Sequence, residues 1–464
     1  MNIGIARRDI TPQAPMELLG YGDRDHKSEG IHDPLSVYVL YIEQPGEQPL
    51  AWFSADLCIF GPDCAKALKQ RIAKATGVDA QAMHLQGTHT HSGPDVYALH
   101  IATGAVEKAY FELLAARFSE ALKEAVKHKH AATLELREGI GTIGVNRRGL
   151  DKPIDRRVFL LDIVDDKGKR SASVMYYSCH LTALGVENYL VSSDWIGPVR
   201  NWYEQDNGFP LMFVQGAEGN VDPWTRGVLD MSDPDQAKGV SFEMVEQIAA
   251  KFYRDLKTIR ATEAINTIEA VKTTSFEASF PLLFGAMDAA GLQKKVDDWK
   301  HEFATFLGIP VSEVPEDGSI NNLIKKRAVE IGSSPEQTEH LVINQFTYTQ
   351  FLWAYGANKD YIDMQKGTIR IPIVVVDFGV LAIVGLPVEP LMDFNLDFQH
   401  KVTESQVVVA GLVDGYFGYL PHRHNFAEQK AEALYETIST VFAPETAEMI
   451  IDEVVDVLKQ GGRR

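Results

Sequence analysis

Residues 82–94 read A-M-H-L-Q-G-T-H-T-H-S-G-P, an apolar run followed by two histidines among small residues. The apolar run predicts a buried strand, and Gly93-Pro94 ends regular structure after it. In extended backbone His89 and His91 point to the same side of the chain. Because neutral imidazole is the commonest metal ligand in proteins, the stretch predicts a strand end that aims two imidazoles into one cavity. A strand end with two hydrogen-bonded histidines is the simpler interpretation, so the other ligands must come from elsewhere in the chain.

Strand-like and helix-like stretches alternate on both sides of this point. Apolar or alternating runs predict strands, and apolar residues spaced by three or four predict helices. The order strand, helix, strand, helix is typical of an α/β layer, so we expect an α/β fold with a mixed β-sheet core and flanking helices. The expected strands are residues 3–10, 36–43, 50–57, 82–86, 132–145, 157–165, 172–178, 211–214, 266–280, 369–377, 379–385 and 406–411, and the expected helices are residues 62–75, 105–128, 196–205, 235–257 and 444–459.

Residues 285–365 differ from the rest of the chain because their pattern is mostly helical and more charged. Strand patterns return after them, so we interpret this segment as a cap-like helical insertion rather than an independent domain. No internal repeat interrupts the remaining sequence. We therefore expect residues 1–464 to form a single domain.

The composition excludes several classes of function. The formal net charge of −19 argues against nucleic acid and against anionic membrane surfaces as partners. No stretch approaches the ~20 apolar residues of a membrane-spanning helix, and the first residues lack the pattern of a signal peptide. The three cysteines, Cys58, Cys64 and Cys179, are odd in number and lie in apolar surroundings, as is typical of reduced core cysteines. We therefore expect a cytoplasmic protein.

Side chains with metal-ligand chemistry follow several of the expected strands. They are His89, His180, Glu389 and Tyr419. Zinc takes nitrogen and oxygen ligands, and a catalytic zinc site keeps one position open for water. Bound water on such an ion becomes acidic enough to serve as hydroxide near neutral pH. Ligands from distant strand ends are typical of an active site built on loops, although spacing alone leaves open whether they converge.

Two further histidine-rich loops each allow two interpretations. Residues 19–34 are rich in glycine, histidine and aspartate, and they form either a solvated connection or an active-site rim in which His32 is the best candidate. His422-Arg423-His424 is either a solvated loop or a binding site for an anionic or hydroxyl-rich substrate.

Several short motifs resemble those of the neutral, non-lysosomal ceramidase family. The similarity covers most of the chain outside residues 285–365, and residues 88–94 (T-H-T-H-S-G-P) are its most specific part. In the family's order, the matching stretches are residues 5–12, 19–22, 30–32, 88–94, 146–147, 179–182 with 193–194, 386–389, 418–419 and 434–440.

The resemblance implies a role for each matching position. It implies a zinc ion held by four ligands, His89, His180, Glu389 and Tyr419. It further implies that His91 faces the substrate, that Tyr435 donates to the oxyanion at the scissile carbonyl, and that Arg147 and His32 line the pocket. A zinc ion lowers the pKa of a phenol as it does that of water, so a tyrosine ligand is chemically sensible.

The chain departs from the family at a serine that is important for amide cleavage. The matching stretch, residues 219–223, reads G-N-V-D-P, so Asp222 stands where the serine is expected. A carboxylate near a metal is a familiar general base, whereas a loop-capping aspartate is the simpler interpretation. We also expect no C-terminal sandwich domain.

Three hypotheses follow for the function. The first is a zinc-dependent hydrolase that cleaves an amide bond in a small or soluble N-acyl substrate, with Asp222 or His91 accepting the proton of zinc-bound water. The second is a zinc-dependent esterase or deacylase for an acylated sugar or metabolite, with Arg147, His422 and His424 binding the substrate. The third is a non-catalytic, metal-stabilised ligand-binding protein. All three expect a small-molecule partner, and a homo-oligomer stays open.

Overall fold

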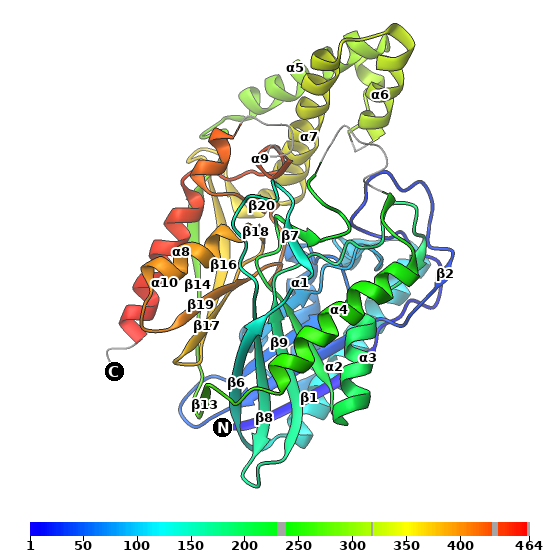
Figure 1. Ribbon diagram of the computed structural model, residues 1–464. Helices are drawn as coiled ribbons and strands as arrows, with labels where there is room; N and C mark the ends of the chain where they lie inside the picture. The colour runs from blue at the N-terminus through cyan, green and yellow to red at the C-terminus, as the bar shows by residue number, and fades with distance from the viewer. Residues whose placement is uncertain (230–237, 317–318, 429–434, 462–464) are drawn as a thin grey trace.

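The computed structural model describes residues 1–229, 238–316, 319–428 and 435–461. Two mixed β-sheets lie face to face, and helices cover the outer face of each (Figure 1). A third group of helices projects beyond the sheets. This arrangement confirms the predicted α/β class with a mixed sheet core and flanking helices.

The larger sheet has nine strands and is mostly antiparallel. Its order is β11-β9-β8-β6-β1-β3-β4-β5, with β13 paired to β6, and the pairs β4–β5 and β9–β11 are parallel. Its strands are β1 (Asn2–Asp9), β3 (Ser36–Glu43), β4 (Leu50–Ala55), β5 (Met83–Gly87), β6 (His130–Ile140), β8 (Arg157–Asp165), β9 (Arg170–Tyr177), β11 (Leu211–Gln215) and β13 (Asn266–Ile268).

The smaller sheet has five strands in the order β14-β16-β17-β19, with β15 paired to β16. They are β14 (Lys272–Pro281), β15 (Ile362–Asp363), β16 (Thr368–Asp377), β17 (Leu381–Gly385) and β19 (Gln406–Ala410). Short pairs of strands lie outside both sheets: β2 (Gly30–Ile31) with β10 (Leu190–Val191), β7 (Gly144–Asn146) with β12 (Val221–Pro223), and β18 (Glu389–Pro390) with β20 (Tyr419–Leu420).

Alternating side chains bury both faces of the sheets. In β3, Val37 and Val39 face the helices, whereas Tyr38 and Leu40 face the smaller sheet. This is the two-residue period of a strand that has a packing layer on each side. The covering helices are α1 (Pro62–Thr76), α2 (Ala105–His128), α3 (Ile196–Asn207) and α4 (Phe242–Arg260) on the larger sheet, and α8 (Asp393–Lys401) and α10 (Thr446–Gly461) on the smaller one.

The larger sheet curves strongly, so that its two edges approach each other. Gln86 of β5 donates a hydrogen bond from Nε2 to the carbonyl of Gln215 at the end of β11 (2.7 Å). One step along, the Ser54 hydroxyl of β4 donates to the carbonyl of Phe213 (2.5 Å). As a result, the carboxyl ends of β5, β9 and β11 lie together, although the first and the last of these are at opposite ends of the strand order.

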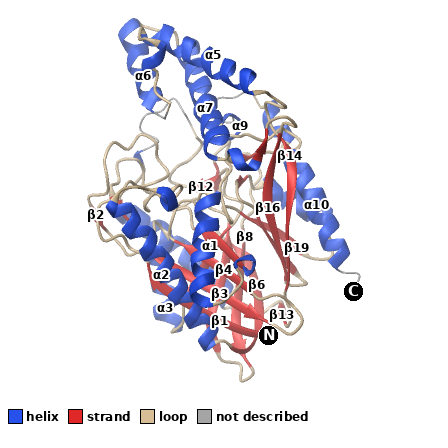
Figure 2. Ribbon diagram, turned by 180° about the vertical axis from the view of Figure 1, so that it is seen from behind, coloured by secondary structure: helices blue, strands red, loops and turns tan. Residues whose placement is uncertain are grey.

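Helices α5 (Ala289–Leu307), α6 (Ser319–Ile331) and α7 (Pro335–Ala357) form the predicted insertion and rise beyond the ends of both sheets (Figure 2). They share a small core that includes Phe303, Ile324 and Tyr348. The single-domain interpretation of residues 1–464 stays a prediction. Within the described residues, no helix is both long and apolar enough to cross a bilayer.

Most predicted elements match the structure to within two residues at each end, and three differ by more. The strand expected at 132–145 is two strands, β6 and β7, and that at 266–280 is β13 and β14. The helix expected from residue 235 begins at Phe242, because the Ser241 side chain caps it by accepting from the amide of Met244. Residues 235–237 of that prediction lie outside the described residues.

A buried carboxylate joins the two sheets and gives a stability prediction. Asp414, which follows β19, accepts from the amide of Leu85 (2.9 Å) and from His84 Nδ1 (2.8 Å), and pairs with Lys69 (3.1 Å). Burial opposes its ionisation, but Lys69 and His84 outweigh burial and lower the pKa of Asp414 from 3.8 to about 2.

We expect Asp414→Asn to lower the free energy of unfolding by about 2 kcal/mol at neutral pH, since one pKa unit is worth ~1.4 kcal/mol. Asparagine tolerates the left-handed backbone of this position (φ 62°), so the charge is the main change. A carboxylate whose pKa is lowered by folding stabilises the folded protein at pH values above its ordinary pKa. This stabilisation is lost as the pH falls toward 2. Urea unfolding of the wild type and the variant at pH 7 and pH 2.5 measures this effect. If the two proteins differed in their free energy of unfolding by the same amount at both pH values, the prediction would be contradicted.

Candidate metal centre

The two histidine motifs meet because the loops after β5 and β9 pair with each other. Thr90 forms a parallel bridge with Leu181, and the amide of His91 donates to the carbonyl of Leu181 (3.3 Å). Each bridging residue has a predicted site histidine next to it. The pairing therefore places His89 and His91 beside His180.

Both buried histidines direct the same nitrogen at one carboxylate oxygen. Glu389 Oε2 lies 3.3 Å from His89 Nε2 and 3.1 Å from His180 Nε2, and the two imidazole centroids are 4.8 Å apart. One ligand atom of each of these three residues lies within 4.8 Å of the other two, and all three residues are buried. Two imidazoles and a carboxylate are a donor set that suits zinc.

The backbone at His89 differs from the prediction. The extended conformation expected for the H-x-H stretch is wrong at this residue, because β5 ends at Gly87 and His89 has a left-handed φ of 70°. Left-handed backbone is strained for a residue other than glycine, and such strain is typical of functional sites. The ring is fixed from behind, since Nδ1 lies 3.2 Å from the carbonyl oxygen of Cys58 and 3.5 Å from its Sγ.

His91 lies next to the pair and contributes its Nε2 to the same space. His91 Nε2 is 3.4 Å from His89 Nε2, and the two rings are nearly perpendicular at 88°. Gly20 is required here, because a Cβ on it would come within 2.3 Å of the His91 ring. Desolvation, with the neighbouring charges of His89 and His180, lowers the pKa of His91 well below its usual value. His91 is therefore uncharged at neutral pH.

Tyr419 is brought to the cluster by the pairing of β18 with β20, in which it stands opposite Glu389. Its ring packs against that of Tyr435, with centroids 5.4 Å apart. The guanidinium of Arg147 lies 5.5 Å from the Tyr419 centroid and 5.3 Å from that of Tyr435. The structure thus brings together three of the pocket residues expected from the resemblance.

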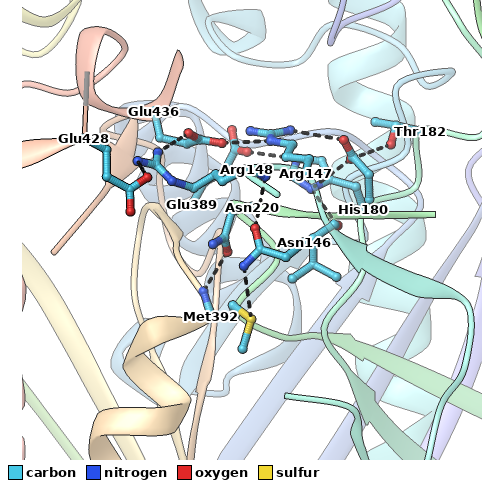
Figure 3. Close-up of polar contacts among 12 residues, drawn as sticks. Asn146, Arg147, Arg148, His180, Thr182, Asn220, Glu389, Met392, Glu428 and Glu436 are labelled. Atoms are coloured by element: carbon cyan, nitrogen blue, oxygen red, sulfur yellow. Dashed lines mark hydrogen bonds and ion pairs between the residues drawn. The ribbon is translucent and has the colours of Figure 1, made fainter. Parts of the chain in front are cut away.

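A buried ion network holds this tyrosine pair in place. Glu436, next to Tyr435 on α9 (Tyr435–Ile438), accepts from Arg147 Nε (2.8 Å) and from Arg148 Nη1 (2.5 Å). Figure 3 shows both guanidinium groups directed at this carboxylate. Arg148 also pairs with Glu428 (3.2 Å). The network ties the turn after β7 to the helix that carries Tyr435.

Asp222 lies on the far side of His180 from Glu389. Its Oδ1 accepts from the Thr182 hydroxyl (3.0 Å) and is 3.6 Å from His180 Nδ1, whereas Oδ2 is 3.6 Å from Arg147 Nη1. Burial opposes its ionisation, but Arg147 and His180 outweigh burial and lower the pKa of Asp222. Its charge is therefore directed at Arg147 and at the back of the His180 ring.

The remaining predicted residues make their contacts elsewhere. The His32 ring stacks on Phe242 with centroids 3.6 Å apart and bonds to Asp33 (2.9 Å). His422 lies 3.4 Å from Asp397, and His424 Nε2 donates to Asp393 Oδ1 at 2.9 Å. Both aspartates belong to α8. A substrate-binding role for these three histidines stays a prediction.

Known proteins resemble the chain in sequence and in fold. It is 22% identical over 521 aligned residues to neutral ceramidase B of Dictyostelium discoideum (96% of this chain, 70% of the relative), and 26% identical over 230 residues to neutral ceramidase 1 of Arabidopsis thaliana (44% and 29%). The chain thus spans less than a third of the second relative. The crystal structure of neutral ceramidase from Pseudomonas aeruginosa has a TM-score of 0.69 over 98% of this chain and 73% of that chain, at 19% identity, so it shows a shared fold.

The family sequence model described as neutral/alkaline non-lysosomal ceramidase, N-terminal, matches residues 1–229. Residues 1–229 of the chain belong to the neutral/alkaline ceramidase family. The predicted resemblance is confirmed, and membership indicates a hydrolase. The matched region includes His89, His180 and Asp222, whereas Glu389 and Tyr419 lie beyond it.

Two residues of this ceramidase-family site were not predicted. Tyr416 donates a hydrogen bond to Glu389 Oε1 (2.7 Å). Glu218, in the loop after β11, is fully buried, and within the described residues neither of its carboxylate oxygens has a hydrogen-bond partner. A Cβ on Gly411 would come within 2.7 Å of that carboxylate, so the glycine makes room for it. The only sequence signal was an acidic residue between glycines.

Burial raises the pKa of Glu218 well above its usual value, and the Glu389 charge adds to this against the opposing effect of His89. Because the pKa of Glu218 is raised in the folded protein, the folded protein is less stable once the pH is high enough to ionise this carboxyl. In metal-free protein we expect Glu218→Gln to raise the free energy of unfolding by at least about 1 kcal/mol at pH 8, because an unpaired buried charge costs that much or more. The gain should vanish below pH 4. Chemical unfolding at the two pH values measures it, and a loss of stability at pH 8 would contradict it.

Proposed function

We propose that the chain is a metal-dependent hydrolase that cleaves the amide bond of an N-acyl substrate. The observation that carries this proposal is the convergence of His89 Nε2 and His180 Nε2 on Glu389 Oε2, at 3.3 and 3.1 Å, in a member of the ceramidase family. Atoms that share one ion at ~2.0–2.2 Å are expected to lie at about these separations.

The donor set fits zinc. His89, His180 and Glu389 would hold the ion, with Tyr419 as the fourth protein ligand. When bound, zinc would supply a Lewis acid and an acidic water molecule. Behind the ligands, the carbonyl oxygen of Cys58 faces His89 Nδ1, and that of Val221 lies 3.2 Å from His180 Nδ1. Such partners fix the tautomer, so that the Nε2 lone pair of each ring is free to bind a metal.

His91 is the residue best suited to accept a proton in this site. It is uncharged at neutral pH, and its Nε2 lies within 3.4 Å of the proposed ligand His89. Asp222 is the weaker candidate, because its carboxylate is directed at Thr182, at His180 Nδ1 and at Arg147. We therefore assign Asp222 to balancing Arg147 and supporting His180, and proton transfer to His91.

Tyr435 and Arg147 are placed to stabilise negative charge on the scissile carbonyl oxygen. Burial, with the charges of Glu389 and Glu436, raises the pKa of Tyr435 to about 12 against the opposing effect of Arg147. The hydroxyl therefore stays protonated and can donate. Arg147 keeps a positive charge against both tyrosine rings. Preorganised donors of this kind are often the largest contribution to catalysis of acyl transfer.

The substrate is proposed as a class rather than as a molecule. The names of the relatives point to ceramide, a lipid N-acyl amide. The aspartate at the position of the family's serine favours a smaller or more soluble N-acyl compound. The two options differ in the length of the acyl chain and share the scissile amide.

The experiment is a substrate panel on purified protein of known metal content. Ceramide, short-chain N-acyl amides and the matching esters would be compared as isolated, after chelation, and after zinc is added back. Amide cleavage that disappears on chelation and returns with zinc supports the proposal. Faster cleavage of esters than of matched amides would favour the esterase hypothesis, and amide cleavage that chelation leaves unchanged would reject the metal.

A further inference from the structure

Glu389 has two carboxylate oxygens with different surroundings. Oε2 faces the two imidazoles, whereas Oε1 accepts the hydrogen bond of the Tyr416 hydroxyl at 2.7 Å. A carboxylate can rotate about its final bond and exchange the two oxygens. A strong donor on one oxygen prevents that exchange and leaves the other directed at the histidines.

The backbone around Tyr416 is built to hold this contact. Before Tyr416, the amide of Leu412 donates to the carbonyl of Val388 (2.9 Å) and that of Val413 to Leu386 (2.9 Å). After it, the amide of Phe417 donates to the carbonyl of Pro387 (2.8 Å).

The fourth bond runs the other way, from the amide of Glu389 to the carbonyl of Gly418 (3.0 Å). Residues 412–418 are therefore fastened to residues 386–389 on both sides of the hydroxyl. These backbone hydrogen bonds hold Tyr416 and Glu389 at a fixed separation.

Tyr416 is distinct from the tyrosine expected at the metal. Tyr419 lies opposite Glu389 in the β18–β20 pair and packs against Tyr435. Tyr416 lies three residues earlier and bonds to the carboxylate oxygen that is turned away from the imidazoles. Tyr416 can therefore be replaced without removing either ring of the Tyr419–Tyr435 pair.

We propose that Tyr416 is a positioning residue, which fixes Glu389 so that a single oxygen is presented to the metal. The inference rests on the proposed metal site. Residues that orient a metal ligand typically contribute 10–100-fold to metal affinity. Tyr416→Phe removes the hydroxyl that bonds to Glu389 and keeps the aromatic ring.

The test is the affinity of the protein for zinc alone, measured by competition with a chromophoric chelator. Tyr416→Phe should weaken zinc binding ~10–100-fold. The matched control is Tyr110→Phe, which removes a buried hydroxyl of α2 that donates to the carbonyl of Ile10 at 2.8 Å. That variant should bind zinc like the wild type.

The outcomes separate this inference from the function beneath it. Zinc affinity within threefold of wild type in Tyr416→Phe, together with its loss in His89→Ala, would overturn the positioning role and leave the metal site standing. Equal weakening in Tyr416→Phe and Tyr110→Phe would also overturn it, because a general loss of stability would then explain both. A wild-type protein that binds no zinc would overturn both proposals. With zinc saturating, Tyr416→Phe should recover kcat, since the hydroxyl itself takes no part in the reaction.

Discussion

His89→Ala protein is expected to bind zinc at least ~100-fold more weakly than wild type and to lose amide cleavage with it, because removing a direct ligand costs more than removing its outer partner. The variant leaves Glu389 Oε2 with a single imidazole, that of His180. Equilibrium dialysis followed by elemental analysis measures the metal, and the substrate panel measures the activity. His180→Ala should behave in the same way.

The control is a histidine on the strand that precedes His89. His84 is buried on β5 and bonds to Asp414, and it is not one of the proposed ligands, so His84→Ala should keep its zinc provided that the variant folds. The rival interpretation is that a proton, not a metal, holds the three residues together. Burial lowers the pKa of His89, but Cys58 and Glu389 outweigh burial and raise it well above its usual value, as in an ion pair. Zinc content that is equal in wild type, His89→Ala and His84→Ala would favour that interpretation.

Glu436→Gln is expected to lower the free energy of unfolding by about 3–5 kcal/mol. The carboxylate is fully buried between Arg147 and Arg148, so its loss leaves two guanidinium groups facing each other without their shared counter-ion. Each guanidinium would keep one other carboxylate, because Asp222 lies 3.6 Å from Arg147 and Glu428 lies 3.2 Å from Arg148. Neither of these replaces the carboxylate that the two arginines share. Urea unfolding gives the measurement.

An exposed ion pair provides the comparison. Glu330 pairs with Arg327 at 3.3 Å on the surface of α6, and Glu330→Gln should change stability by less than about 1 kcal/mol. Equal effects of the two glutamate variants would contradict the assignment of Glu436 to a buried network. The network also holds Tyr435, so activity in Glu436→Gln should fall further than the folded fraction does.

Strong periodicity made the secondary structure predictable. The strand at residues 36–43 and the helix at residues 105–128 have the predicted bounds, because each has a long unbroken pattern. Errors occurred where the pattern continued through a break in hydrogen bonding. The start of α4 depended on the Ser241 cap, which an extended helical pattern concealed.

The site was predictable in its residue types and not in its contacts. His180 and Glu389 are 209 residues apart in sequence, and only the resemblance joined them before the structure did. The direction of Asp222 toward His180 Nδ1 depends on how the loops pack, and so does the lack of a hydrogen-bond partner for Glu218 among the residues that the structure describes. Local pattern carries no information about either. Tyr416 had no signal of its own, since a tyrosine between glycines is equally consistent with a core residue.

The proposed ligands span the chain from residue 89 to residue 419, and this has a consequence for biosynthesis. The ribosome must synthesise residues 89 through 419 before all four side chains exist, so a nascent chain that ends at residue 229 carries His89 and His180 but neither Glu389 nor Tyr419. The proposed site would therefore form only late in translation, and a chain that stops before Glu389 would lack it.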